Sequence, residues 1–177
     1  MPKLPRKAKA VAAAVGAALV AGLAALGSRT TRKPGRPYAS LDGLQPAFRA
    51  RVQELLANMR ARGFDPLVWE TYRDPARGEK LNAKQGGVLV GASMHCLGLA
   101  ADIVDAKRRW AAPDFFTALG EEAERIGLVW GGRFKNPDGS EGRDRPHVQA
   151  IPIEAQQAAR TLTTAAELDA LARQYIG

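Results

Sequence analysis

Hydrophobic residues recur at helical spacing in two long stretches of the chain. The first covers residues 45–63, and its apolar residues fall on one helical face: Phe48, Val52, Leu55, Leu56 and Met59. Pro46 suits a first turn, and Gly63 is placed to end the helix. The second covers residues 112–128, again with apolar residues at helical spacing: Phe115, Phe116, Leu119, Ala123 and Ile126. Both stretches predict helices that pack on a core.

Shorter apolar runs predict strands between and after these helices. Three segments have this pattern: 66–73, 98–105 and 146–151. A short helix and loop are expected at 75–87, and a polar segment with turn residues at 135–144. Two helical stretches close the chain, the last capped by Thr163 or Thr164. Because the short strands do not alternate regularly with helices, the sequence predicts an α+β fold, not a doubly wound sheet.

The first 27 residues differ in character from the rest. Four basic residues open the chain, and residues 10–28 then carry no charge and are mostly Ala and Gly. This is the layout of a secretory signal peptide, and the small residues at 25–27 suit signal peptidase. The uncharged run is also near the roughly 20 residues of a membrane span, so a cleaved signal and a weak anchor both stay open. We expect export to the periplasm or cell surface, with a membrane tether at residues 10–28 if the segment is kept.

The net charge is +8, and the excess lies in the N-terminal part. Residues 28–37, SRTTRKPGRP, hold four more Lys and Arg residues and predict a flexible basic linker over 28–40. The chain from Tyr38 onward is nearly neutral, so nothing calls for a nucleic-acid partner, and a basic stalk beside an anionic envelope polymer fits better. Residues 41–177 are enough for one domain. The single cysteine, Cys96, excludes an internal disulfide.

The chain has only two histidines, His95 and His147, and each lies beside a predicted strand. Asp102 follows His95 by seven residues inside an apolar run, where an unpaired carboxylate would be costly. Two imidazoles and one carboxylate, with a fourth position left to water, form a catalytic zinc arrangement. The alternative is that both histidines are ordinary half-buried residues and that Asp102 caps a turn.

A second carboxylate, Asp144, stands three residues before His147, and Pro146 stiffens the chain between them. Such a carboxylate can accept a proton from a water that a metal has acidified, as hydrolysis of an amide requires. The alternative for Asp144 is a solvated acid in a charged loop.

Three segments of the chain resemble one known enzyme family. SMHCLGLAADI, residues 93–103, resembles the Ser-x-His-x-x-Gly-x-Ala-x-Asp signature of the zinc D-Ala-D-Ala carboxypeptidase and L-alanyl-D-glutamate endopeptidase family. This family includes vancomycin-resistance D,D-carboxypeptidases and several phage endolysins. VWGGRF and DRPHVQ resemble its Trp-Gly-Gly and Asp-x-Pro-His-Phe-Gln segments, in the same order. The resemblance covers about Leu41 to Ile153.

This resemblance implies a small antiparallel sheet flanked by helices, as in hedgehog and D,D-peptidase domains. It implies a zinc peptidase that acts on peptidoglycan stem peptides. Separately, we expect the protein to be a monomer. The implied zinc ligands are His95, Asp102 and His147, and the implied general base is Asp144. The Asp-x-Pro-His form is closer to the endolysin-type endopeptidases than to the carboxypeptidases, where a glutamate more often precedes the last ligand. The L-Ala–D-Glu bond is therefore favoured over the D-Ala–D-Ala bond.

Four further residues match the family or suit its site. Arg73 lies where the family has an arginine that faces substrate, and it can hold a stem-peptide carboxylate or stabilise an oxyanion. The alternative is an ordinary surface ion pair. Ser93 can donate to substrate or to a loop carbonyl, with a structural role equally open. Gly98 allows a close backbone approach, and Trp130 is expected in the core or on the floor of the substrate cleft.

Two residues depart from the family pattern. Cys96 stands directly beside His95, and a thiolate there can in principle ligate zinc or act as a nucleophile. Neighbours in an extended chain point to opposite sides, so we expect Cys96 to be a small buried apolar residue. Val148 replaces the usual aromatic residue after the last ligand, which would enlarge or loosen the substrate wall.

Two other classes of function compete with the metallopeptidase. A non-catalytic, zinc-bearing cell-wall binding or signalling module would have the same fold, as animal hedgehog domains do, but Asp144 and Arg73 argue against it. A cysteine peptidase would use Cys96 as its nucleophile. A host wall enzyme and a phage endolysin both fit the sequence.

Overall fold

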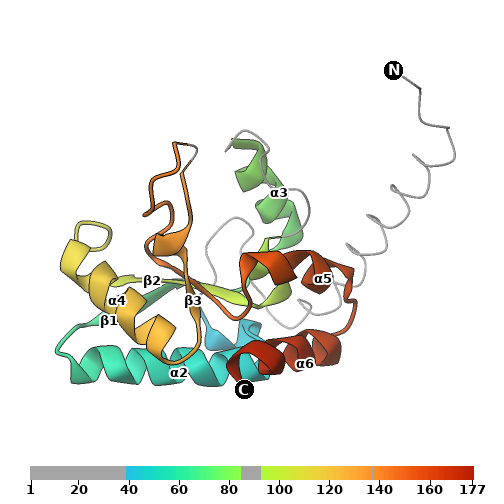
Figure 1. The fold of residues 1–177 in the computed structure, drawn as a ribbon, viewed down its shortest axis with the longest axis horizontal. Helices are drawn as coiled ribbons and strands as arrows, with labels where there is room; N and C mark the ends of the chain where they lie inside the picture. Colours follow the sequence, from blue (N-terminus) through green and yellow to red (C-terminus); the bar gives the residue numbers. More distant parts are fainter. Residues whose placement is uncertain (1–38, 85–92, 137) are drawn as a thin grey trace, which may run out of the picture.

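The protein is described by a computed structural model that covers residues 39–84, 93–136 and 138–177 (Figure 1). The predicted signal or anchor segment and most of the basic linker lie outside these residues. Within the described ranges, no helix is both long and apolar enough to cross a membrane.

Four antiparallel strands form one sheet in the order β1-β2-β4-β3. Their bounds are β1 Pro66–Glu70, β2 Ala100–Asp105, β3 Val129–Trp130 and β4 His147–Gln149. The predicted α+β class with a small antiparallel sheet is confirmed. β1 is shorter than predicted, because the chain leaves the sheet after Glu70 to approach the turn that carries His95.

The strand register brings residues that are distant in sequence into one row. Asp102 in β2 lies opposite Glu70 of β1 and opposite His147 of β4. Residues that face each other across antiparallel strands point to the same side of the sheet, with Cβ atoms about 5 Å apart. The register alone therefore places two carboxylates and one imidazole together on one face.

Helices pack on the sheet and complete the core. Their bounds are α2 Pro46–Ala61, α3 Pro75–Lys84, α4 Pro113–Arg125, α5 Gln156–Thr161 and α6 Ala165–Ile176. α2 packs on α6, on α4 and on β1, and in Figure 1 α2 and α6 lie together below the strands. The apolar face predicted for α2 is buried, with Phe48, Leu55 and Met59 inaccessible to solvent. α3 and the segment that follows β3 project to the opposite side.

The helix ends marked in the sequence have the expected geometry. Gly63 follows α2 with a φ of 85°. Thr164, and not Thr163, caps α6, because its hydroxyl accepts a hydrogen bond from the Glu167 backbone N–H at 3.2 Å. The Glu167 carboxylate in turn accepts one from the Thr164 backbone at 2.9 Å.

Gly98 closes the turn between His95 and β2, with a φ of 68°. Its carbonyl accepts a hydrogen bond of 3.0 Å from the backbone N–H of Gln45. A Cβ atom at position 98 would lie 2.6 Å from the carbonyl oxygen of Gly43. The turn that carries His95 is thus joined to the chain entering α2, and the expected close backbone approach is confirmed.

We expect Gly98→Ala to lower the free energy of unfolding by about 2–4 kcal/mol, because it combines a left-handed backbone with overlap against Gly43. Gly63→Ala is the matched control. Its φ is also positive, 85°, but no atom lies within 4 Å of the added Cβ, so a loss of about 1 kcal/mol is expected. Urea unfolding of the metal-free protein, followed by tryptophan fluorescence, measures both variants. Equal losses would contradict the role given to the Gly43 contact.

Candidate metal centre

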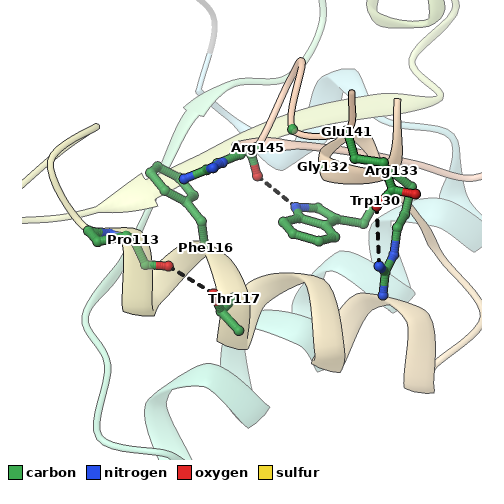
Figure 2. A pocket seen from close by; sticks show the side chains of 9 residues that line it. Pro113, Phe116, Thr117, Trp130, Gly132, Arg133, Glu141 and Arg145 are labelled. Carbon is green, nitrogen blue, oxygen red and sulfur yellow. Dashed lines mark hydrogen bonds and ion pairs between the residues drawn. The ribbon is translucent and has the colours of Figure 1, made fainter. Parts of the chain in front are cut away.

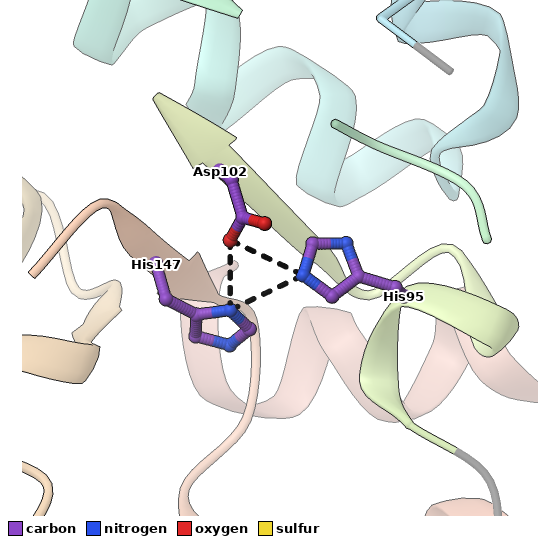
Figure 3. Close-up of side chains that lie close together, drawn as sticks. All are labelled: His95, Asp102 and His147. Atoms are coloured by element: carbon purple, nitrogen blue, oxygen red, sulfur yellow. Dashed lines mark hydrogen bonds and ion pairs between the residues drawn. The ribbon is translucent and has the colours of Figure 1, made fainter. Parts of the chain in front are cut away.

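Three side chains from separate elements meet on one face of the sheet (Figure 3). His95 comes from the 3₁₀ turn Met94–Leu97, Asp102 from β2 and His147 from the start of β4. Nε2 of His95, Nδ1 of His147 and Oδ1 of Asp102 are each 3.2 Å from the other two. Among the described residues, no other group of His, Cys, Asp and Glu side chains forms such a cluster. The structure thus brings together the three residues that the resemblance implied as ligands.

Each imidazole is oriented by a hydrogen bond at its far nitrogen. Nδ1 of His95 lies 2.7 Å from the carbonyl oxygen of Thr71. A carbonyl oxygen only accepts, so Nδ1 carries the proton and Nε2 keeps a free electron pair. Nε2 of His147 lies 3.1 Å from the side-chain oxygen of Gln149, which leaves the electron pair on Nδ1. Thr71 and Gln149 were not predicted from the sequence, although a two-residue spacing on a strand places Gln149 beside His147.

The three facing atoms fit a bound divalent metal. All three are acceptors without a proton between them, and such groups repel one another unless a cation lies among them. Ligand atoms that are about 2.1 Å from a tetrahedral zinc ion stand roughly 3.4 Å apart. The observed separations of 3.2 Å are close to this value. Two neutral imidazoles and one carboxylate are also a known type of zinc ligand set.

Asp102 carries the negative charge of the cluster. Burial raises the pKa of its carboxyl, but positive charge and hydrogen bonds from protonated His95 and His147 rings lower it by a larger amount, and the net shift is downward. Asp102 is therefore ionised at neutral pH, as a metal ligand must be. Burial lowers the pKa of His147, whereas Asp102 and Asp144 raise it, with a net upward shift. A proton and a metal ion thus compete for the His147 ring.

Asp144 lies beside the cluster on the segment that follows the Trp-Gly-Gly motif. Its Oδ2 is 3.9 Å from Nδ1 of His147, and its side chain is 47% exposed. A Cβ on Gly131 would overlap the carbonyl of Asp144 and lie 2.8 Å from Cβ of His147, so this approach requires glycine. Burial raises the pKa of Asp144, His147 lowers it and Asp102 raises it, with a net upward shift. An accessible carboxylate in this position can accept a proton.

Arg73 approaches the cluster from the segment after β1. Its Nη2 lies 2.7 Å from Oε2 of Glu70 and 3.9 Å from Oδ2 of Asp102. Its Nη1 donates a long hydrogen bond, 3.5 Å, to the hydroxyl of Ser93. Only 15% of the Arg73 side chain is exposed, so the alternative of an ordinary surface ion pair is wrong.

Glu70 holds the Arg73 guanidinium in place, and the sequence analysis did not predict this residue. The Glu70 carboxylate is nearly buried and accepts hydrogen bonds from Arg73 and, at 3.0 Å, from Nε of Arg77. Burial raises the pKa of Glu70, but the two arginines lower it, and the net shift is downward. The only sign of this role in the sequence is that Glu70 precedes Arg73 by three residues near the end of a predicted strand.

Cys96 lies in the same 3₁₀ turn as His95. The expectation that the two side chains point apart because the chain is extended there is therefore wrong. The Cys96 sulfur nevertheless faces α3, where a Cβ on Gly78 would lie 2.9 Å from Sγ. Burial raises the pKa of the Cys96 thiol to about 11, although Arg73 lowers it. Cys96 is therefore a protonated, buried residue at neutral pH, as expected, and this disfavours a cysteine peptidase.

Trp130 does not lie with the metal cluster. It is paired with Val148 across β3 and β4, and Val148 points to the side of the sheet opposite to its neighbour His147. The indole packs against Gly120 of α4, and its Nε1 donates a 2.7 Å hydrogen bond to the carbonyl of Arg145 (Figure 2). Trp130 lines a separate pocket of about 270 Å³ next to α4. This packing supports the core interpretation of Trp130 over a place on the floor of the substrate cleft.

The aromatic ring beside the last ligand comes from another position than expected. Val148 is fully buried in the core, so it forms no part of a substrate wall, and that expectation is wrong. Phe134 instead lies against His147, with ring centroids 5.7 Å apart. Phe134 follows the Trp-Gly-Gly motif closely but was not singled out from the sequence.

The small antiparallel sheet directs two imidazoles and a carboxylate to one point. A second carboxylate and an arginine lie beside them, and this arrangement is typical of a metallopeptidase site. A family profile described as D-alanyl-D-alanine carboxypeptidase matches residues 89–150, which include the three cluster residues and Asp144. This match confirms the family resemblance of the motifs in this segment of the chain, and the His-Asp-His cluster lies within it.

Two solved structures have a similar fold. One is the L-Ala D-Glu endopeptidase ChiX of Serratia marcescens, with a TM-score of 0.52 and 22% identity over 72% of this chain and 95% of that chain. The other is VanYB in complex with D-alanine-D-alanine, with a TM-score of 0.50 and 19% identity over 78% of this chain and 90% of that chain. These similarities establish the fold. No curated protein sequence matches the chain significantly.

We expect Asp102→Asn to weaken zinc binding by roughly 100-fold or more, because an amide supplies neither the charge nor the donor strength of a carboxylate. Cys96→Ala serves as the control, since Cys96 lies outside the cluster. Zinc content after dialysis against a weak chelator measures both variants. Full zinc retention by Asp102→Asn, or zinc loss by Cys96→Ala, would contradict the ligand assignment.

Proposed function

We propose that the chain is a zinc-dependent peptidase that hydrolyses an amide bond in peptidoglycan stem peptides. The proposal depends mainly on the placement of Asp144 and Arg73 next to the cluster, each with an atom 3.9 Å from a cluster residue. A module that only binds zinc needs neither an accessible carboxylate nor a fixed guanidinium at that place. The non-catalytic alternative is therefore disfavoured. The family profile over residues 89–150 supports the class of substrate.

Each residue of the site has a separate role in the proposed amide hydrolysis. His95, Asp102 and His147 would hold a zinc ion, which supplies a Lewis acid for the scissile carbonyl and lowers the pKa of a bound water. Asp144 accepts the proton of the attacking water and returns it to the leaving amine. Glu70 keeps the Arg73 guanidinium close to the reacting group, where it stabilises developing negative charge or binds a carboxylate of the stem peptide.

The L-Ala–D-Glu bond is the favoured target. The segment Asp144-Arg145-Pro146-His147 resembles the endolysin-type endopeptidases, whereas the carboxypeptidases more often have a glutamate before the last ligand. The fold is also similar to that of an L-Ala D-Glu endopeptidase. The competing target is the D-Ala–D-Ala bond, which the description of the family profile favours.

We also infer that the enzyme acts outside the cytoplasm. The basic start of the chain and the uncharged run at residues 10–28 support export, and the basic residues at 28–37 suit a position near an anionic wall polymer. Export would bring the enzyme to the compartment of its proposed substrate.

Asp144→Asn tests the catalytic part of the proposal. Asparagine has nearly the same shape but cannot accept the proton, so the turnover of purified peptidoglycan should fall roughly 100-fold or more while zinc content is unchanged. The matched control is Asp138→Asn, an exposed aspartate of the same loop whose carboxylate contacts Ser140. Wild-type turnover in Asp144→Asn would rule out its role as general base.

Mass spectrometry of the digestion products identifies the bond. Cleavage between L-Ala and D-Glu should release peptides with a new D-Glu amino terminus and leave L-Ala on the muramic acid. Release of free D-alanine instead, without new amino termini inside the stem peptide, would assign the chain to the carboxypeptidases.

A further inference from the structure

The outer nitrogen of His147 begins a chain of side-chain hydrogen bonds that leads away from the cluster. Nε2 of His147 points away from Asp102 and His95 (Figure 3) and lies 3.1 Å from Oε1 of Gln149. Gln149 is 1% exposed, and the spacing of two residues on β4 puts its side chain on the same face as His147. Oε1 of Gln149 also accepts a hydrogen bond of 3.2 Å from Nε2 of Gln156 in α5.

The direction of this chain is fixed at its far end by Arg160. A guanidinium has donors only, so Oε1 of Gln156 must face Nη2 of Arg160, at 3.0 Å. Nε2 of Gln156 must then face Gln149 and donate to its oxygen. The amide nitrogen of Gln149 is occupied separately, because it donates to the carbonyl of Ile151 at 2.5 Å. Rotating either amide by 180° would place donor against donor or acceptor against acceptor.

A fixed Gln149 oxygen selects one tautomer of His147. Since that oxygen can only accept, Nε2 of His147 carries the ring proton, and Nδ1 keeps its electron pair towards Asp102 and His95. In the other tautomer, a proton on Nδ1 would occupy the point shared by the three ligand atoms. His95 is set by the backbone carbonyl of Thr71, which does not depend on a side chain. The orientation of His147, in contrast, depends on the side chains of Gln149, Gln156 and Arg160.

We propose that Gln149, Gln156 and Arg160 act as positioning residues that set the tautomer of His147 and thereby raise the affinity of the site for its metal. This inference rests on the proposed metal site. The family profile ends at residue 150, so Gln156 and Arg160 of α5 lie outside the segment that it matches. The metal site is thus completed by a helix that the family match does not contain. Loss of such outer contacts typically weakens metal binding by about 10- to 100-fold.

Zinc affinity measured by competition with a chromogenic chelator tests the proposal. Gln149→Leu should raise the zinc dissociation constant roughly 10- to 100-fold, and Gln156→Leu roughly threefold or more. The control is Gln157→Leu, the same substitution at the next residue of α5, whose side chain is exposed. Wild-type affinity in both Gln149→Leu and Gln156→Leu would overturn the proposal.

A second measurement separates tautomer control from a general loss of stability. In ¹⁵N–¹H correlation spectra of the metal-free protein at alkaline pH, His147 should carry its proton on Nε2, and Gln156→Leu should weaken this preference. Only two histidines contribute signals, and His95 should show the opposite tautomer. A wild-type His147 protonated on Nδ1 would refute the proposal. If Gln149→Leu does not fold, Gln156→Leu decides. If the wild type binds no zinc, the proposed function fails, but the spectra still decide this inference.

Discussion

Three electron pairs point at one another in the interior of this protein, on Nε2 of His95, Nδ1 of His147 and Oδ1 of Asp102, at separations of 3.2 Å. Groups of this kind repel one another and have lost most of their contact with water, so the surrounding structure must hold them together. Backbone interactions hold most of the cluster in place. The register of β2 and β4 sets two of the three residues opposite each other, and the Gly98 turn joins the third to the chain entering α2. The positions of the three ligand residues are therefore set mainly by the fold of the backbone.

Two aspartates near this point have opposite electrostatic behaviour because their surroundings differ. Asp102 lies between two imidazoles, and their effect on its pKa outweighs that of burial. Asp144 lies at the edge of the cluster, where burial and the charge of Asp102 raise its pKa. One carboxylate thus stays ionised and suits a permanent ligand, while the other binds a proton more readily and suits proton transfer. The same residue type serves two roles through position alone.

Arg73 and Gly131 complete the surroundings of the cluster. Arg73 pairs with the buried carboxylate of Glu70, and this pairing keeps its positive charge next to the cluster. Asp102 is therefore not the only acid that balances this charge. Gly131 lets the backbone after β3 approach both Asp144 and His147 more closely than a side chain would permit. These contacts join the segment after β3 to the ligand strand. They explain in physical terms why the Trp-Gly-Gly and Asp-x-Pro-His segments occur together.

The sequence by itself determined the α2 helix, the β2 strand and the α+β class, because apolar spacing follows from the geometry of consecutive residues. The three residues that converge on one point were implied by the family resemblance of the motifs, since two histidines and an aspartate alone also fit ordinary half-buried residues. Only the tertiary structure decided which ring nitrogens face the cluster, where the sulfur of Cys96 points and on which side of the sheet Trp130 lies. These properties depend on contacts between distant segments, such as that of His95 with Thr71, 24 residues away, and with His147, 52 residues away. A local sequence pattern cannot predict such contacts, because the protonation and direction of a side chain are set by atoms that only folding brings next to it.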